Sequence, residues 1–327
     1  MSRRQLEVRD ERWPIAGRFA ISRGAKTEAR VVVAQIREGG CVGRGECVPY
    51  ARYGESVVGV VRSLEEVRDP IEAGATRQAL GALLAPGAAR NALDCALWDL
   101  EAKQGGEPAW KLARLAEPRA VTTAYTLSLD TPAAMAEAAR AAAERPLLKL
   151  KLADEDPLAR VSAVREAAPA SRLLVDANEA WTLETLRSVV PGLASLGVEL
   201  IEQPLPAAGD AVLAEVECAV PLCADESWRG GDLARLRGLY DFVNLKLDKT
   251  GGLTAALEHA AEARRLGFRI FLGCMVGTSL AMAPALLLAG LADYVDLDGP
   301  LLLERDRQPG LVFEGSRIQP PPRALWG

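Results

Sequence analysis

Five charged residues follow one another along the chain at nearly equal intervals, and each lies at the end of a short apolar run. They are Lys151, Asp176, Glu202, Asp225 and Lys249, separated by 25, 26, 23 and 24 residues. A charged side chain at the end of a buried strand is unfavourable unless it is paired or bound to an ion. The regular spacing of three acids and two amines therefore predicts that they form one functional site.

The three acids have the chemistry of a metal site. Carboxylates gathered at neighbouring strand ends repel one another unless a cation lies among them, and oxygen donors favour Mg²⁺ over Mn²⁺ or Ca²⁺. The alternative is that each acid caps the helix that follows it, which a single strand-end aspartate commonly does. Because Asp176, Glu202 and Asp225 occur in register, the pattern favours one bound Mg²⁺ per subunit.

The lysines have the chemistry of proton transfer. Lys149 and Lys151 are two residues apart and share one face of a strand, while leucines take the other face. The leucines argue against two solvated surface lysines. Two neighbouring ammonium groups lower each other's pKa, and a lowered lysine pKa suits a general base near neutral pH.

A second lysine pair occurs four apolar runs later. Lys246 and Lys249 are three residues apart, so spacing alone does not choose between them. Lys249 can reach the site if the strand ends before it, which the sequence Thr250-Gly251-Gly252 favours. In an eight-stranded barrel the second and sixth strands lie opposite each other. Lys151 and Lys249 would then remove and return the α-proton of a metal-held carboxylate from opposite faces, which inverts that carbon.

The elements that position these residues form a repeat of about 25 residues that starts near residue 121. Eight short apolar runs alternate with segments of helical pattern such as 131–144 and 253–266. The runs are 121–129, 147–152, 173–177, 199–203, 221–226, 242–248, 269–274 and 294–298. This alternation predicts an α/β fold with a (β/α)8-type barrel over residues 119–300.

The first 118 residues have a different pattern. Two strand-like segments, 29–37 and 41–46, flank the turn Glu38-Gly39-Gly40, and a helical pattern covers 88–103. We expect an α+β domain over residues 1–118, with a boundary near Glu117-Pro118. The tail 301–327 is too short for a domain, and we expect it to pack back on that α+β domain.

Composition restricts the class of protein. The chain of 327 residues has 49% hydrophobic and 25% charged residues, a net charge of -5 and no block of lysine and arginine, so we expect no nucleic-acid partner. The charged segment 1–13 is no secretory signal, which favours the cytoplasm. Six cysteines without a C-x-x-C pair predict reduced packing residues, and the single histidine, His259, excludes a histidine-based triad or zinc site.

One uncharged stretch is long enough to cross a bilayer. It covers 23 residues, 270–292. Gly273, Gly277 and Pro284 interrupt it, and the repeat divides it into a buried strand, a turn and a buried helix. We therefore expect no membrane span.

The motifs together resemble the muconate-lactonizing subgroup of the enolase superfamily and, within it, the bacterial dipeptide epimerases. The resemblance covers nearly the whole chain. It depends on Lys149-Leu150-Lys151, Asp176-Ala177-Asn178-Glu179, Glu202-Gln203-Pro204, Asp225-Glu226-Ser227, Lys246 to Gly252 and Asp296-Leu297-Asp298-Gly299-Pro300. It implies a modified TIM barrel with an α+β capping domain, one Mg²⁺, a small dipeptide substrate such as L-Ala-L-Glu or L-Ala-D-Glu, and a place in peptidoglycan recycling.

The resemblance also implies roles for residues. Asp176, Glu202 and Asp225 would bind Mg²⁺, Lys151 and Lys249 would be the acid/base pair, and Lys149 would help to hold the substrate carboxylate. Asp296 and Asp298 would receive the α-ammonium group of a dipeptide, although a pair of helix caps would look the same. Further substrate contacts would come from Arg23 in a loop over 18–26, a second covering loop over 49–55, and the pocket-lining residues Thr126, Cys274 and Met275, where packing is an equal explanation.

Two rival functions stay open. A cycloisomerase or o-succinylbenzoate synthase of the same superfamily would use the same metal and lysines but needs no acid pair for an ammonium group. A non-catalytic barrel that binds amines or metals would use the lysines only as ion-pair partners. The sequence leaves open the exact dipeptide, its stereochemistry and whether the chain forms a homo-oligomer.

Overall fold

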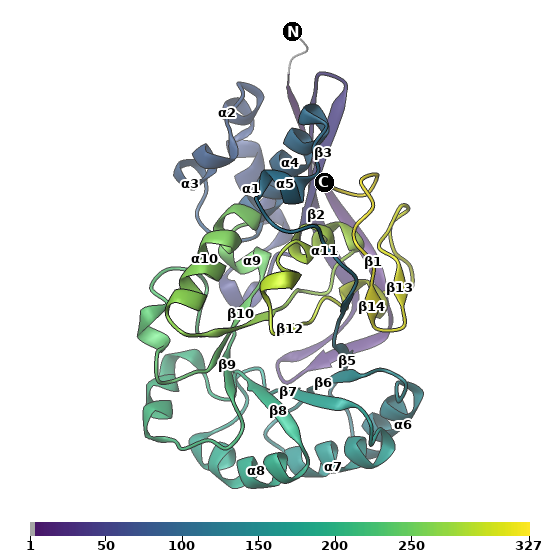
Figure 1. Ribbon diagram of the computed structural model, residues 1–327, viewed down its shortest axis with the longest axis vertical. Helices are drawn as coiled ribbons and strands as arrows, with labels where there is room; N and C mark the ends of the chain where they lie inside the picture. Colours follow the sequence, from purple (N-terminus) through teal and green to yellow (C-terminus); the bar gives the residue numbers. More distant parts are fainter. Residues whose placement is uncertain (1–3) are drawn as a thin grey trace.

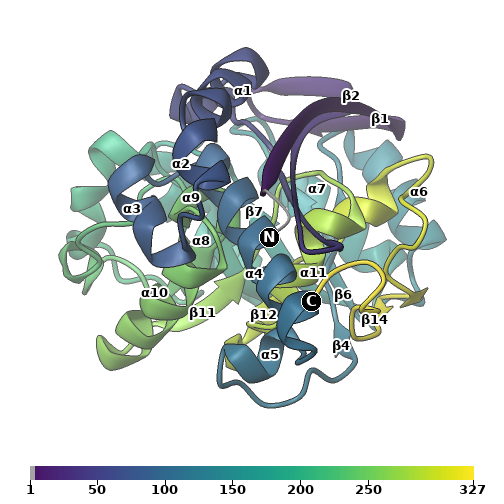
Figure 2. The same ribbon diagram turned by 90° about the horizontal axis from the view of Figure 1, so that it is seen from above.

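The computed structural model describes residues 4–327. An antiparallel sheet with its helices lies against one end of a larger barrel (Figure 1). We call residues 4–118 the capping region. Seen from above, the strands β1 and β2 curve over one side of the barrel (Figure 2).

The sheet of the capping region has the strand order β1-β2-β3. The strands are β1 (Gln5–Ile21), β2 (Gly24–Glu38) and β3 (Cys41–Cys47). The turn between β2 and β3 has φ of 58° at Gly39 and 81° at Gly40, which confirms the predicted hairpin. The expected loop over 18–26 is wrong in its extent, because most of it belongs to a β1–β2 hairpin whose register pairs Phe19 with Lys26.

The helices of the capping region follow β3, and the longest of them packs against the sheet. They are η1 (Ala51–Tyr53), α1 (Val57–Glu66), α2 (Arg68–Glu72), η2 (Arg77–Ala79), α3 (Leu80–Leu83), α4 (Ala88–Gly105) and α5 (Ala109–Leu112). The predicted helix over 88–103 is α4. It packs directly on β3, where a Cβ on Gly43 or Gly45 would lie 2.1 Å from a carbonyl oxygen of the helix. These two glycines therefore allow the close approach of strand and helix.

The barrel contains the eight predicted strands in sequential parallel order. They are β5 (Tyr125–Leu127), β6 (Leu147–Lys151), β7 (Arg172–Asp176), β8 (Val198–Glu202), β9 (Leu222–Ala224), β10 (Phe242–Leu245), β11 (Arg269–Leu272) and β12 (Tyr294–Val295). A buried apolar cluster fills the interior of the barrel. Each strand contributes one residue, except that Ala124 immediately precedes β5: Ala124, Leu147, Leu174, Leu200, Cys223, Phe242, Phe271 and Tyr294. The outermost strands are not paired as a ladder, but Ala124 N donates to Val295 O at 2.8 Å. The sheet thus curls into the expected barrel.

The segments between these strands are helical, with two departures. The α-helices are α6 (Pro132–Ala141), α7 (Pro157–Ala167), α8 (Leu183–Ser195), α9 (Leu247–Thr250), α10 (Leu253–Arg265) and α11 (Ser279–Leu286). Thr131 caps α6 by accepting from Ala134 N, as its position before Pro132 predicts. After β8 and β9 there are only the 3-10 helices η3 (Ala207–Glu215) and η4 (Ala234–Leu236). Prolines and glycines around 204–209 and 230–238 explain why regular helices do not form there.

The uncharged stretch over 270–292 forms most of β11, a turn, α11 and the 3-10 helix η5 (Ala289–Leu291), as predicted. Within residues 4–327, no helix is long and apolar enough to cross a membrane. All six cysteines are free.

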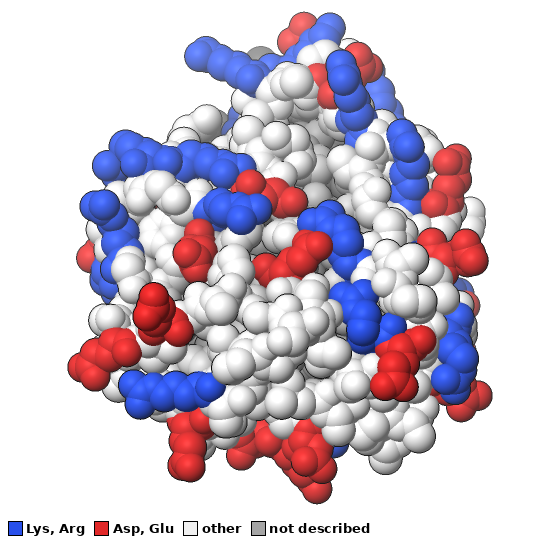
Figure 3. Space-filling view, turned by 60° about the horizontal axis from the view of Figure 1, so that its bottom comes forward, with Lys and Arg blue, Asp and Glu red and all other residues white. Residues whose placement is uncertain are grey.

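The chain beyond residue 300 returns along the molecule. After η6 (Gly299–Leu302), β13 (Phe313–Glu314) and β14 (Arg317–Ile318) form a small sheet with β4 (Val121–Thr122), which lies outside the barrel sheet. The final residues contact the capping region, where Trp326 Nε1 donates to Cys95 O at 3.0 Å. On the face shown in Figure 3, basic and acidic side chains are interspersed, and neither sign forms one continuous patch.

Candidate active site

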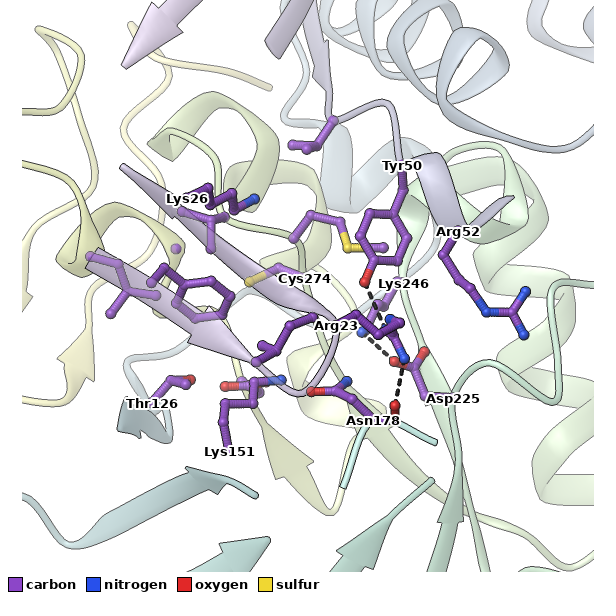
Figure 4. Close-up of a pocket in the computed structure, with 18 of the residues that line it drawn as sticks. Arg23, Lys26, Tyr50, Arg52, Thr126, Lys151, Asn178, Asp225, Lys246 and Cys274 are labelled. Atoms are coloured by element: carbon purple, nitrogen blue, oxygen red, sulfur yellow. Dashed lines mark hydrogen bonds and ion pairs between the residues drawn. The ribbon is translucent and has the colours of Figure 1, made fainter. Parts of the chain in front are cut away.

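A cavity of about 440 Å³ lies between the capping region and the barrel. Its wall combines the β1–β2 hairpin, the segment 48–52 that follows β3, and residues at the carboxyl ends of the barrel strands. Figure 4 shows Lys151, Asp225 and Lys246 rising from the barrel toward Arg23 and Tyr50 of the capping region. The cavity therefore lies at the strand ends beneath the capping region, where the sequence predicts the reactive residues.

The three predicted acids lie side by side. Asp176 ends β7 and Glu202 ends β8, and the sheet register pairs these two residues directly. Asp225 follows β9 two residues after Cys223, the register partner of Glu202. All three are at most 2% exposed. Burial together with the nearby Asp176 carboxylate raises the pKa of Glu202 to about 7.

Lys149 and Lys151 lie on the same face of β6, and the register pairs Lys151 with Asp176. Lys151 Nζ donates to Asp176 Oδ2 at 2.5 Å, while Lys149 Nζ lies 2.6 Å from Glu202 Oε2 and 2.7 Å from Asp296 Oδ2. The expected lowering of pKa by two adjacent ammonium groups is wrong for Lys149. Burial does oppose its charge, but Asp296, Glu202 and Asp176 together raise its pKa well above the ordinary value.

Lys246 and Lys249 both reach Asp225. The strand β10 ends at Leu245, so Lys249 lies in the short helix α9. Lys246 Nζ is 2.7 Å from Asp225 Oδ2 and Lys249 Nζ is 2.7 Å from Asp225 Oδ1. Burial lowers the pKa of Lys249, whereas Asp225 and Glu202 raise that of Lys246 against the effect of burial. Of the two, Lys249 therefore has the electrostatics of a base.

The donor chemistry of the three acids fits a hard divalent cation. Within the described part of the chain, no group of three or more acids, cysteines or histidines is arranged around a common metal position, because lysine ammonium groups lie between the carboxylates. Glu202 Oε2 is buried and has the Lys149 ammonium group as its partner at 2.6 Å, and the atoms that the three acids could offer to a metal are all oxygens. At the strand ends, five buried carboxylates (Asp176, Glu202, Asp225, Asp296 and Asp298) face four lysines (Lys149, Lys151, Lys246 and Lys249). When all five carboxylates are ionised they outnumber the lysines by one, so an added cation would favour their ionised forms.

Asp296 and Asp298 follow β12 at the other side of the cavity. Asp298 Oδ2 accepts from Thr126 N at 2.6 Å, and burial together with Asp296 raises the pKa of Asp298 to about 7. Asp296 Oδ1 is buried and accepts no hydrogen bond from residues 4–327. Both residues line the cavity, so the pair offers acceptor oxygens to a cationic ligand.

The capping region is fastened to the barrel around Arg23. Its guanidinium donates to Glu226 Oε1 at 2.6 Å, to Asn178 O at 2.6 Å and to the Tyr50 hydroxyl at 2.8 Å. In the segment over 49–55, Arg52 forms a bidentate ion pair with Glu179 at 2.6 and 2.7 Å. Both predicted covering segments therefore reach the cavity, and Arg23 and Arg52 bind acids of the barrel. Thr126, Cys274 and Met275 also line the cavity.

Sequence reasoning missed three residues. Asn244 Nδ2 donates to Glu202 Oε1 at 2.5 Å, and a buried asparagine in the strand Phe242–Leu245 is the signal that could have found it. Gln203 Oε1 accepts from the backbone N–H groups of Asp225 and Ser227 at 2.9 and 3.0 Å, which fixes the strand end that carries Asp225. Lys26 lines the cavity, although only Arg23 was expected to do so from this hairpin.

Two family models match the chain. Residues 3–113 match the family described as "Mandelate racemase / muconate lactonizing enzyme, N-terminal domain", and residues 133–324 match "Enolase C-terminal domain-like". The two matched segments correspond to the capping region and to most of the barrel with its tail.

Two relatives match over almost their full length. An L-Ala-D/L-Glu epimerase of Escherichia coli K12 is 46% identical over 313 residues, covering 95% of this chain and 98% of the relative. An N-acetyl-D-glutamate racemase of Pseudoalteromonas sp. is 47% identical over 304 residues, covering 91% and 95%. Both relatives are isomerases.

Solved structures agree with this similarity. An enolase family member from Agrobacterium tumefaciens with homology to dipeptide epimerases, solved with bound sodium and L-Ala-L-Glu, has a TM-score of 0.97 and 53% identity and covers 99% of this chain and 100% of that one. A dipeptide epimerase from Enterococcus faecalis V583 complexed with Mg and L-Leu-L-Tyr has a TM-score of 0.89 and 28% identity, with 98% of both chains covered.

Proposed function

This chain belongs to the enolase superfamily, in the branch of mandelate racemase and muconate lactonizing enzyme, and we propose that it is a magnesium-dependent dipeptide epimerase that inverts the α-carbon of the C-terminal residue. One observation carries the proposal. Two buried lysines, Lys151 and Lys249, arise four strands apart in an eight-stranded sheet, and each bonds a different member of the carboxylate row between them.

The proposed roles follow from these positions. Asp176, Glu202 and Asp225 would hold one Mg²⁺, which when bound would withdraw electron density from the substrate carboxylate and so acidify the α-proton. Lys149, whose pKa is raised, stays charged and would hold the same carboxylate. Lys151 Nζ would take or return the α-proton on one face and Lys249 Nζ on the other.

The ends of the substrate are assigned to two further parts of the cavity wall. Asp296 and Asp298 would receive the α-ammonium group of the N-terminal residue, and Thr126 positions Asp298 through its backbone N–H. Arg23 would lie beside the side chain of the C-terminal residue, with Cys274 and Met275 as apolar neighbours. Peptidoglycan recycling and a cytoplasmic location remain predictions from the sequence.

Proton exchange in D₂O tests this proposal. With Mg²⁺ present, L-Ala-L-Glu should gain one deuterium at the α-carbon of glutamate and convert in part to L-Ala-D-Glu, which mass spectrometry and proton NMR both detect. Removal of divalent ions with EDTA should abolish exchange, and added Mg²⁺ should restore it. Absence of exchange with every member of a panel of L,L-dipeptides would exclude the proposal.

A second candidate is racemisation of an N-acyl amino acid. The relative from Pseudoalteromonas sp. favours it, and so does the state of the acid pair, because Lys149 already neutralises Asp296 and Asp298 has a pKa of about 7. N-acetylglutamate carries no ammonium group for these acids. A wild-type rate with N-acetyl-L-glutamate above that with L-Ala-L-Glu would favour this candidate, and the reverse order favours the dipeptide.

A further inference from the structure

The helix α4 of the capping region lies against the part of the barrel that carries Lys249. This part is the segment 246–254, which contains α9, two glycines and the first residues of α10. Side chains of α4 form hydrogen bonds with this segment along one face of the helix, because the residues that make them are spaced three or four apart. They are Arg90, Asn91, Asp94 and Trp98.

The bonds from α4 reach both sequence neighbours of Lys249. On one side, Asn91 Nδ2 donates to Asp248 Oδ1 at 2.8 Å. On the other side, the Arg90 guanidinium donates to Thr250 O at 2.6 Å. Because α4 holds the chain immediately before and after Lys249, the position of its Nζ depends on that helix.

The two glycines after Thr250 allow this close contact. Gly251 and Gly252 have φ of 87° and 109°, and a Cβ on Gly252 would lie 2.5 Å from the side chain of Asp94. Asp94 Oδ2 accepts from Thr254 N at 2.9 Å, and Asp94 Oδ1 accepts from the Thr254 hydroxyl at 2.5 Å. Asp94 is 2% exposed, so these bonds are shielded from water. The segment 246–254 is therefore also held at its end.

The two proposed bases are held in different ways. Lys249 lies in α9, a single turn of four residues, which needs packing partners to be stable. Lys151 belongs to β6, which pairs with β5 on one side and β7 on the other. The barrel sheet thus positions Lys151, whereas a helix of the capping region helps to position Lys249.

Resting on the proposed function, we propose that Arg90 and Asp94 are positioning residues for Lys249 and set the rate of proton transfer on its face of the α-carbon alone. Both residues lie outside the cavity wall, so they act through the segment 246–254. A displacement of about 1 Å between reacting groups can cost on the order of 100-fold in rate. Loss of the contacts from α4 should therefore slow proton transfer by Lys249 and leave that by Lys151.

Separate exchange rates of the two diastereomers test this inference. The initial rate of α-proton loss in D₂O is measured for L-Ala-L-Glu and L-Ala-D-Glu, and Lys151→Met and Lys249→Met identify which diastereomer each lysine deprotonates. For the diastereomer that Lys249 deprotonates, Arg90→Met should lower kcat by about 10-fold with little change in KM. For the other diastereomer, kcat should change by less than about threefold. Arg90→Lys, which keeps a donor for Thr250 O, should recover most of the loss.

A second variant and a control come from the same helix. Asp94→Ala should slow proton transfer by Lys249 by about 10- to 100-fold. Lys103→Met also removes a cation of α4 that bonds a backbone carbonyl, but this carbonyl is Val42 O of the capping region. Both of its rates should therefore stay within about threefold of wild type. Within one variant the ratio of the two rates does not depend on the fraction of folded enzyme, so partial unfolding cannot imitate the expected result.

The outcomes separate the inference from the function on which it depends. If the Arg90 and Asp94 variants slow both diastereomers by the same factor, or slow neither, α4 has only a structural role and this inference alone is overturned. If wild type exchanges neither diastereomer, or if Lys151→Met and Lys249→Met retain exchange with the same one, the proposed function fails and the inference fails with it.

Discussion

At the scale of single residues, the site is a set of buried charges whose pairing decides their roles. Asp225 bonds two ammonium groups, and although burial opposes its charge, Lys246 and Lys249 hold the pKa of this carboxyl well below its ordinary value. Glu202 has the opposite shift, because burial and the neighbouring Asp176 and Asp225 carboxylates outweigh the effect of its ion pair with Lys149. A cation bound at Glu202 would favour the ionised carboxylate. Its binding would therefore release a proton from those molecules in which Glu202 is protonated.

Asp298 gives a prediction at this scale. Asp298→Asn keeps an oxygen that can accept from Thr126 N but removes the negative charge offered to an ammonium group. We expect kcat/KM for L-Ala-L-Glu to fall about 10- to 100-fold and that for N-acetyl-L-glutamate to change by less than about threefold. Initial rates of deuterium incorporation measure both. Equal decreases in kcat/KM with the two substrates would show that Asp298 does not bind the ammonium group.

Much of the site could be predicted because its residues follow the repeat. Asp176 and Glu202 end their strands at the same level, so their spacing in the sequence fixes their register in the sheet. Which carboxylate each lysine contacts could not be predicted, since long side chains reach across several strands. Lys149, for instance, contacts Asp296, which comes 147 residues later. The pKa of Lys149 consequently rises, although its neighbour Lys151 alone would lower it.

At the scale of elements, the strands were easier to predict than their connections. Each of the eight barrel strands overlaps one predicted apolar run, with β7 and β8 beginning one residue earlier, because a strand buried on both faces requires such a run. The long strand β1 was not predicted, since its charged residues hide the alternation that marks a half-buried strand. Lys26 consequently looked like part of a loop, although it sits in a hairpin register opposite Phe19.

The contact between β3 and α4 gives a prediction for these elements. In Gly45→Ala the added Cβ would lie 2.1 Å from Ala92 O and 2.7 Å from Ala96 N, so strand and helix must move apart. We expect the free energy of unfolding to fall by about 2 kcal/mol or more, measured by urea denaturation. Gly81→Ala, in a helix with open space around it, is the control and should be neutral or slightly stabilising. A Gly45→Ala protein as stable as wild type would contradict this view of the packing.

At the scale of the whole molecule, buried polar contacts join the capping region to the barrel. Asp248, beside Lys249, accepts from Val48 N at 3.0 Å and from Asn91 Nδ2 at 2.8 Å. Trp98 of α4 donates to Thr254 of α10 at 2.9 Å. The cavity lies between the capping region and the barrel. These contacts therefore fix the position of the capping region relative to Lys151 and Lys249 of the barrel.

This interface predicts a pH effect on stability. Burial raises the pKa of Asp248 from its ordinary value of 3.8 to about 7. A raised folded-state pKa contributes stability that is complete below the unfolded value and is lost as the pH rises through the folded value. Ionisation of Asp248 should therefore lower the free energy of unfolding of wild type between pH 3.8 and about 7, and this contribution is missing in Asp248→Asn. Urea denaturation across this window should show the free energy of unfolding of the variant rising relative to that of wild type as the pH rises. A difference between the two proteins that is independent of pH would refute the assignment.

The central claim is that Lys151 and Lys249 act on opposite faces of one α-carbon. It is tested most directly by following deuterium exchange into L-Ala-L-Glu and L-Ala-D-Glu separately, by proton NMR, with Lys151→Met, Lys249→Met and, as a matched control, Lys246→Met. Each of the first two variants should lose epimerisation by about 100-fold or more but still exchange one of the two diastereomers, and the two should retain different ones. Lys246→Met, which also removes a partner of Asp225, should slow deuterium exchange into both diastereomers by the same factor. If Lys151→Met and Lys249→Met retain exchange with the same diastereomer, or if either still epimerises at the wild-type rate, the two lysines do not work from opposite faces.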